Sequence, residues 1–168
     1  MKGGFIIKKT IKYLKDKKAY TSSVDFVIFF TLAVILCIML FEMTMAVFSI
    51  YNVNLASGNA ARTVAISGEL TASDSQKLYE EIDEQLKGRI IEDSLEITIT
   101  TTNANTSYVP AQTVVINKDT APTYKVNLGD EFKVNVSGET NLFHVSAIPV
   151  KAPVSATSYG VGEVYFKK

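Results

Sequence analysis

The hydrophobic positions of this chain follow three patterns in turn, and each pattern predicts a different element. An unbroken apolar run comes first, sixteen residues from Phe26 to Phe41 without a charge. Glu42 interrupts the run, and apolar residues then continue to Tyr51. As a helix, residues 26–51 would be about 39 Å long at about 1.5 Å per residue, whereas a bilayer's hydrocarbon core is about 30 Å thick. The run therefore predicts a membrane span over about residues 26–48.

The second pattern is a face of small and aliphatic residues beyond Tyr51, which extends the same helix. Ser22 and Ser23 ahead of Asp25 are typical of a helix N-terminus. No proline occurs before Pro110, and Gly68 is the first strong stop signal. We expect one helix over residues 22–67, whose outer part packs on the domain that follows. The small-residue face consists of Val53, Ala56, Ala60, Ala61, Val64 and Ala65.

A second, shorter helix follows. Ser73 and Gln76 have the spacing of a capping box. Leu78, Ile82 and Leu86 recur at intervals of four and predict one buried face, and Gly88 ends the helix.

The third pattern is alternation with a period of two, which predicts strands. Leu95, Ile97 and Ile99 alternate with polar residues, and residues 124–136 read as a hairpin around the turn Gly129-Asp130-Glu131. Weaker strands are expected over residues 113–117, 147–150 and 161–166, with Pro149 and Pro153 favouring an edge or a turn. Helices followed by strands predict an α+β domain with an antiparallel sheet over residues 68–168.

Charge predicts the orientation of the span. Residues 1–21 hold seven lysines against the single acid Asp16, whereas residues 52–168 hold fourteen acids and ten bases. The excess of lysines keeps residues 1–21 in the cytoplasm as a basic leader and sends the domain to the extracytoplasmic side. We therefore expect a single-pass protein of the cell membrane. A cleaved signal peptide is the alternative, with a poor cleavage site near Ala56-Ser57-Gly58.

The sequence offers little for catalysis. Cys37 is the only cysteine, so disulfides within one chain are excluded. His144 has no nearby acid, and the run of acids in the second helix reads as a solvated face. No nucleophile elbow, phosphate loop or basic stripe is present. We expect no enzyme, no cofactor, no metal site and no nucleic-acid partner. The acids in question are Glu80, Glu81, Asp83 and Glu84.

The apolar segment carries the unusual chemistry, because an ionisable residue at membrane depth is costly. In one reading, Asp25 lies among the headgroups and Glu42 near the outer boundary. In the other, these carboxylates pair with positive groups of a neighbouring chain, so the segment is an assembly surface. Ala56, Ala60 and Ala61 are further candidate contacts, because small residues let helices approach closely.

These residues resemble a known family. Val24-Asp25-Phe26 opens the apolar segment, Glu42 comes late in it, and a small-residue helix with Ala60-Ala61-Arg62 leads into a small α+β domain. Over about residues 21–68 the chain is similar to the TadE-like minor pseudopilins of tight-adherence (Tad) pilus systems and to related proteins of Gram-positive bacteria.

The resemblance implies recognition by a prepilin peptidase, which in that family usually cuts after a glycine, five residues before an acid. If Asp25 is that acid, Tyr20 precedes the cut, Thr21 begins the mature chain, and Phe26 follows the acid. Tyr20 replaces the usual glycine and Asp25 the usual glutamate. An uncleaved chain would remain a membrane assembly component, whereas a cleaved chain could enter a filament.

Two functions follow as hypotheses. The resemblance implies a pilin-like structural or assembly subunit of a Tad-type or related envelope-spanning pilus or secretion system, with the membrane and other pilin-like or pilus-assembly proteins as partners. The alternative is a membrane-tethered extracytoplasmic binding module that forms no filament. A tethered module needs only a span and a linker, yet the residues after Tyr51 continue a helix pattern, which favours the first hypothesis.

Overall fold

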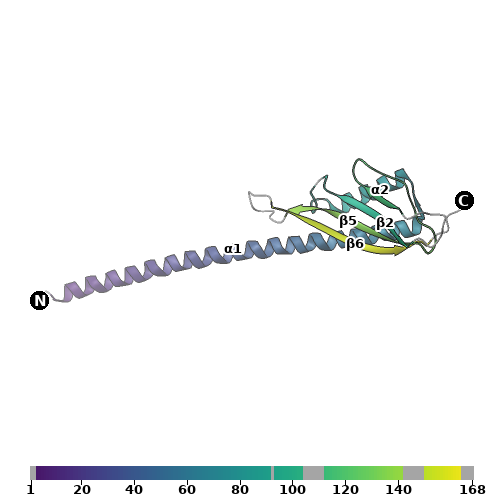
Figure 1. The fold of residues 1–168 in the computed structure, drawn as a ribbon. Coiled ribbons are helices and arrows are strands. Elements are labelled where there is room, and N and C mark those ends of the chain that lie inside the picture. Colours follow the sequence, from purple (N-terminus) through teal and green to yellow (C-terminus); the bar gives the residue numbers. More distant parts are fainter. Residues whose placement is uncertain (1–2, 92, 104–111, 142–149, 164–168) are drawn as a thin grey trace. The chain divides into compact units, whose positions relative to one another are not determined.

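The computed structural model of the chain describes residues 3–91, 93–103, 112–141 and 150–163, with the side chains of the first helix described from residue 23 onward (Figure 1). The chain forms two units, Met1–Phe41 and Glu42–Lys168. Helix α1 (Gly3–Ser67) contributes residues to both units. All the strands and the second helix belong to the second unit.

Helix α1 ends where the sequence predicts but begins earlier. Gly68 takes a positive φ of 68° and donates its N–H to the Val64 carbonyl at 3.3 Å, which ends the helix at Ser67. The predicted start at Ser22 is wrong, because α1 already begins at Gly3. Residues 5–57 contain neither proline nor glycine, and a helix tolerates hydroxyl residues that bond the carbonyl four positions back. Thr31 makes such a bond to the Val27 carbonyl at 2.8 Å.

Helix α2 (Ala72–Leu86) confirms the predicted buried face but not the predicted cap. Its N-cap is Thr71, whose hydroxyl accepts the Asp74 N–H at 3.3 Å. The Asp74 carboxylate accepts the Thr71 hydroxyl at 2.7 Å and the Thr71 N–H at 3.3 Å. These hydrogen bonds lower the pKa of Asp74. Ser73 and Gln76 already lie inside the helix, because the capping box is Thr71 with Asp74.

The main sheet has four antiparallel strands in the order β3-β2-β5-β6, which confirms the α+β class. The long strand β5 pairs with β2 on one side and with β6 on the other, and β3 and β6 form the two edges (Figure 1). The strands are β2 (Glu96–Asn103), β3 (Thr113–Ile116), β5 (Glu131–Asn141) and β6 (Lys151–Val161).

The predicted hairpin over residues 124–136 is wrong. Its first half forms β4 (Tyr124–Lys125), which pairs with β1 (Glu69–Leu70) in a separate two-stranded sheet. The turn still forms, because Gly129 takes a φ of 83° and the buried Asp130 carboxylate accepts the Asn127 N–H at 2.9 Å. The turn does not join two paired strands, because β5 pairs with β2 and β6 and not with β4.

The C-terminal strand also differs from the sequence prediction. It begins at Lys151 and ends at Val161, where a strand over 161–166 was expected to begin. Residues 147–149 and 164–166 lie outside the described part of the chain, and Val150 is not in a strand. Pro153 does lie on an edge strand, as predicted, because an edge position does not require its missing N–H.

The core lies on one face of the main sheet. Alternate residues of three strands are buried there, and both helices contribute side chains to the same hydrophobic cluster. The Ser57 hydroxyl of α1 donates to the Val134 carbonyl of β5 at 3.0 Å, which joins helix and sheet. The buried apolar residues of β2, β5 and β6 are Ile97, Ile99, Phe132, Val134, Val136, Val154 and Ala156.

Candidate functional site

The first candidate surface is the apolar part of α1 in the first unit. Every residue from 23 to 41 is exposed, including Phe29, which is 78% exposed. By length and composition, α1 is able to cross a membrane. A continuous apolar surface of this kind is unfavourable in water, so it indicates a contact with lipid or with other apolar helices.

Asp25 and Phe26 lie at the start of this surface. Asp25 is exposed, and the Phe26 ring stacks on Phe30 with 6.2 Å between the ring centroids. Tyr20 and Thr21 belong to the backbone of α1, and their side chains lie outside the described part. The four residues of the predicted peptidase site thus lie on consecutive turns of one helix.

Glu42 differs sharply from Asp25 in its surroundings. Its side chain is only 4% exposed, within the second unit, which begins at this residue. Ser49, about two turns further along α1, is also buried, and its hydroxyl donates to the Met45 carbonyl at 3.1 Å. Glu42 is therefore a buried acid at the start of the second unit.

The three alanines that the sequence suggested as assembly contacts lie in the core of the domain. Ala56 and Ala60 are fully buried, and Ala61 is 4% exposed. Small side chains are needed at these positions because the sheet of the same chain approaches the helix there. In this structure the three side chains are not accessible to a second subunit, and the domain itself occupies the face that they form.

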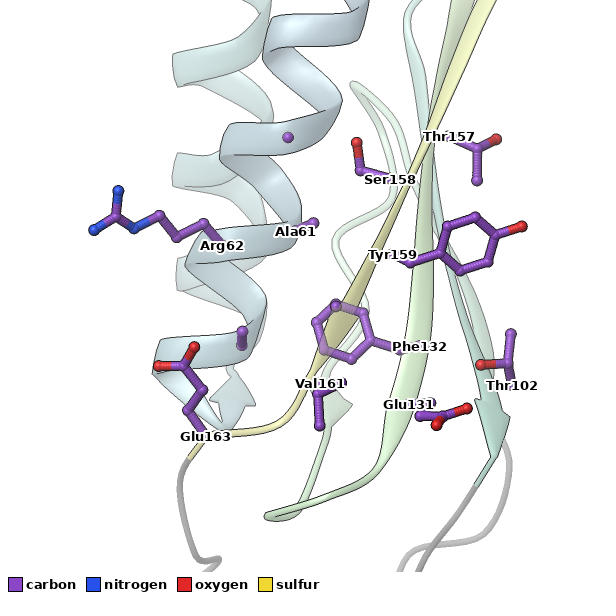
Figure 2. Close-up of a pocket in the computed structure, with 13 residues that line it drawn as sticks. Ala61, Arg62, Thr102, Glu131, Phe132, Thr157, Ser158, Tyr159, Val161 and Glu163 are labelled. Carbon is purple, nitrogen blue, oxygen red and sulfur yellow. The ribbon is translucent and has the colours of Figure 1, made fainter.

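The second candidate surface is a cavity of about 900 Å³ between α1 and the end of β6, open to solvent. Gly58, Ala61 and Ala65 form its helical wall, and the β6 residues from Thr157 to Val161 form the opposite wall. Figure 2 shows the Phe132 ring against β6, Arg62 extending away from the strand, and Tyr159 on the side of β6 that faces away from α1.

Gly160 shapes this cavity. A Cβ atom at Gly160 would lie 2.5 Å from the Phe132 Cζ atom, closer than atoms in folded proteins approach. The Phe132 side chain is fully buried, and it also lines the cavity. The aromatic ring lies directly on the backbone of β6, so any side chain at position 160 would force the ring to shift.

Two buried hydroxyl groups, those of Thr101 and Tyr124, lie next to this region and are paired with each other. The Thr101 and Tyr124 hydroxyls are hydrogen-bonded at 3.0 Å. Burial raises the pKa of Tyr124, and the nearby Asp130 raises it further, although the Thr101 hydrogen bond acts in the opposite direction. Tyr124 therefore stays neutral at physiological pH and serves the core, with its hydroxyl satisfied.

Within the described residues, no three His, Cys, Asp or Glu side chains come together in a way that could hold a metal ion. The acids of α2 are exposed on its outer face, as the sequence predicts. His144 lies outside the described part of the chain.

The cavity is the feature that sequence reasoning missed. Its two walls come from residues about one hundred positions apart, and β6 itself was not recognised. A signal was present, because Ala152, Val154, Ala156, Ser158 and Gly160 alternate as small residues on the core side. No protein family model, curated protein or solved structure matches this chain.

Proposed function

We propose that this protein is a pilin-like structural or assembly subunit of a Tad-type or related envelope-spanning machine. One observation carries the proposal: the helix with a fully exposed apolar surface over residues 23–41 also supplies core residues of the α+β domain. Val53, Ala60 and Val64 of α1 are all at least 99% buried in that core.

This double use of α1 separates the proposal from the alternative of a tethered binding module. A tether needs a span and a flexible linker, and the domain could then fold without the span. Here the segment that follows the apolar surface is helical and is part of the domain's core. The same helix thus supplies both the apolar segment and part of the domain's core, which suits a subunit that assembles through its helix.

The proposal gives the two ends of the apolar segment different roles. The seven lysines before Tyr20 would keep the N-terminus in the cytoplasm. Tyr20, Thr21, Asp25 and Phe26 would be the recognition sequence of a prepilin peptidase. Asp25, being exposed, would be available to a positive group of a neighbouring subunit, such as the amine that cleavage creates at Thr21. Glu42 would serve the domain, where it is buried.

The test is the intact mass of the protein isolated from its native membrane, in cells with and without their prepilin peptidase. We expect a chain that begins at Thr21 when the peptidase is present and a full-length chain when it is absent. An Asp25→Asn variant, which keeps the size of the side chain, serves as the matched control for the role of the charge.

A chain that keeps residues 1–20 in both strains would contradict the processed-subunit form of the proposal. Loss of the protein from the membrane fraction in both strains would contradict membrane anchoring as well. Recovery of the chain alone in the membrane, without co-purifying pilin-like proteins, would favour the tethered binding module.

A further inference from the structure

Strand β6 presents a free backbone edge. Gly162 donates its N–H to the Asp130 carbonyl at 2.9 Å and accepts the Gly129 N–H at 2.9 Å, so its backbone groups face the β5 side. Backbone direction alternates along a strand, so even-numbered residues of β6 bond to β5 and odd-numbered residues point outward. None of the described residues forms a backbone hydrogen bond with the outward groups of Ser155, Thr157, Tyr159 and Val161.

This edge lacks the features that normally prevent strand addition. Natural edge strands are short, or carry lysine, proline or a bulge. Lys151 and Pro153 protect only the first part of β6, and residues 154–161 contain neither a charge nor a proline. Tyr159 is 76% exposed and Val161 is 51% exposed. The second half of β6 is therefore open to another strand.

The cavity lies beside this open half. Its β6 wall is formed by Thr157–Val161, and its helical wall includes Gly58, Ala61 and Ala65. An added strand would lie about 4.8 Å from β6. The small side chains of α1 leave room for it, and its side chains on the helix side would cover them. The sheet thus has space for one more strand over α1.

The direction of the strands identifies the occupant. The main sheet has an even number of antiparallel strands, so its edges β3 and β6 run in opposite directions. Two copies in the same orientation would therefore bring β6 of one antiparallel to β3 of the next. Antiparallel pairing of β6 with β6 would need a two-fold axis perpendicular to the sheet, which reverses one α1 relative to the other. We propose that β6 of one copy binds β3 of a second copy in the same orientation.

This inference rests on the proposed function, because copies anchored in one membrane must point the Glu42 end of α1 to the same side. Strand β3 is suited to pair with β6 of a second copy. Gln112 faces β2 by accepting the Thr101 N–H at 2.9 Å, so Thr113 and Val115 point outward. Val114 lies on the helix side, half-buried against the core, and would face the apolar wall of the cavity.

The contact between β6 of one copy and β3 of the next is short, and it does not produce a closed dimer. The Asn117 backbone is already bonded to Thr120, at 3.0 and 3.2 Å, which leaves Thr113 and Val115 to form about four hydrogen bonds. A contact between two different edges repeats from copy to copy and produces an open array. The weak β6–β3 contact would set the spacing of subunits, while the apolar segments supply much of the association energy.

The experiment is cross-linking of two full-length chains, both Cys37→Ser, co-expressed in membranes. One carries Tyr159→Cys and the other Thr113→Cys, and a short bismaleimide joins adjacent thiols. We expect a mixed dimer only when both chains are present. Adding Thr157→Pro to the first chain should lower the yield of the mixed dimer about tenfold, because the β6 edge loses a hydrogen-bond donor and strand contacts.

Thr157→Val in the same chain is the matched control and should leave the yield unchanged. Proline at position 157 keeps the β5–β6 pairing because the N–H of Thr157 points outward, as the nitrogen of Pro153 does. A dimer of the Tyr159→Cys chain alone would overturn the inference in favour of a two-fold β6 pair. Absence of any dimer would also overturn it.

Carbonate extraction of the same membranes keeps this inference separate from the proposed function. A chain that remains in the washed membranes without a β6–β3 cross-link overturns the strand pairing and leaves the proposed function in place. A chain released by the wash overturns the proposed function, and the cross-link then reports on the strand pairing by itself.

Discussion

At the scale of single residues, Gly160 and Gly58 line the same cavity but have different surroundings. A Cβ atom at Gly160 would meet the Phe132 ring at 2.5 Å, whereas at Gly58 the nearest atom would be the Ser158 Oγ at 4.0 Å. Gly58 also lies inside α1, where glycine is a poor helix former. The same added methyl group should therefore act in opposite directions.

We expect Gly160→Ala to destabilise the domain by about 1–3 kcal/mol through overpacking, and Gly58→Ala to stabilise it by about 0.5–1 kcal/mol. Urea unfolding of the detergent-solubilised full chain, followed by circular dichroism, would measure both changes in free energy. Equal effects of the two substitutions would mean that the Phe132 ring does not lie on the Gly160 backbone.

At the scale of elements, the start of α2 distinguishes the observed cap from the one that the sequence suggests. Thr71→Ala removes the hydroxyl that accepts the Asp74 N–H, and should lower the free energy of unfolding by about 1 kcal/mol. Ser73→Ala is the matched control, because Ser73 is exposed inside the helix. Thermal unfolding of the two variants would show the difference. A larger loss for Ser73→Ala would place the cap where the sequence pattern has it.

Much of the order of helices and strands could be predicted, because it follows from hydrophobic patterns that extend over many residues. The buried face of α2, the alternation of β2 and the end of α1 at Gly68 all follow from spacing and stop signals. The hairpin prediction failed because the Tyr124 strand pairs with Glu69–Leu70, a pairing between distant residues that local alternation cannot reveal. Strand β6 was missed because its core side consists largely of small residues, which give weak alternation.

The candidate surfaces were predictable to different degrees. The apolar segment of α1 is evident from composition alone, since sixteen uncharged residues need no tertiary information. The burial of Glu42 and of the alanines depends on what the domain packs against them. The cavity depends on the approach of Gly58 to Ser158, which only the folded sheet brings about.

At the scale of the whole molecule, the two units differ in whether their apolar side chains are exposed or buried. The first unit exposes its large apolar side chains over residues 24–41, while the second buries a core of both helices and the sheet. A polar residue should therefore have different consequences in the two parts of α1.

We expect Ile35→Lys, in the middle of the apolar run, to disfavour membrane insertion by about 2.5–3.5 kcal/mol. Leu55→Lys is the matched control, because Leu55 is 47% exposed on the domain part of the same helix. The measurement is the fraction of each full-length variant that remains in carbonate-washed membranes. The idea of a membrane span would be wrong if Ile35→Lys and Leu55→Lys stayed in the membrane equally.

The chain makes the two sides of its core at different times. Ser57 bonds to Val134, 77 positions later, and the Ala65 carbonyl accepts the N–H of Glu163. During synthesis, the helix face therefore leaves the ribosome well before the strands that cover it, so the domain can complete its core only once β6 has emerged. Until then the nascent chain displays the uncovered helix face of Val53, Ala60 and Val64, a surface that is buried only in the finished domain.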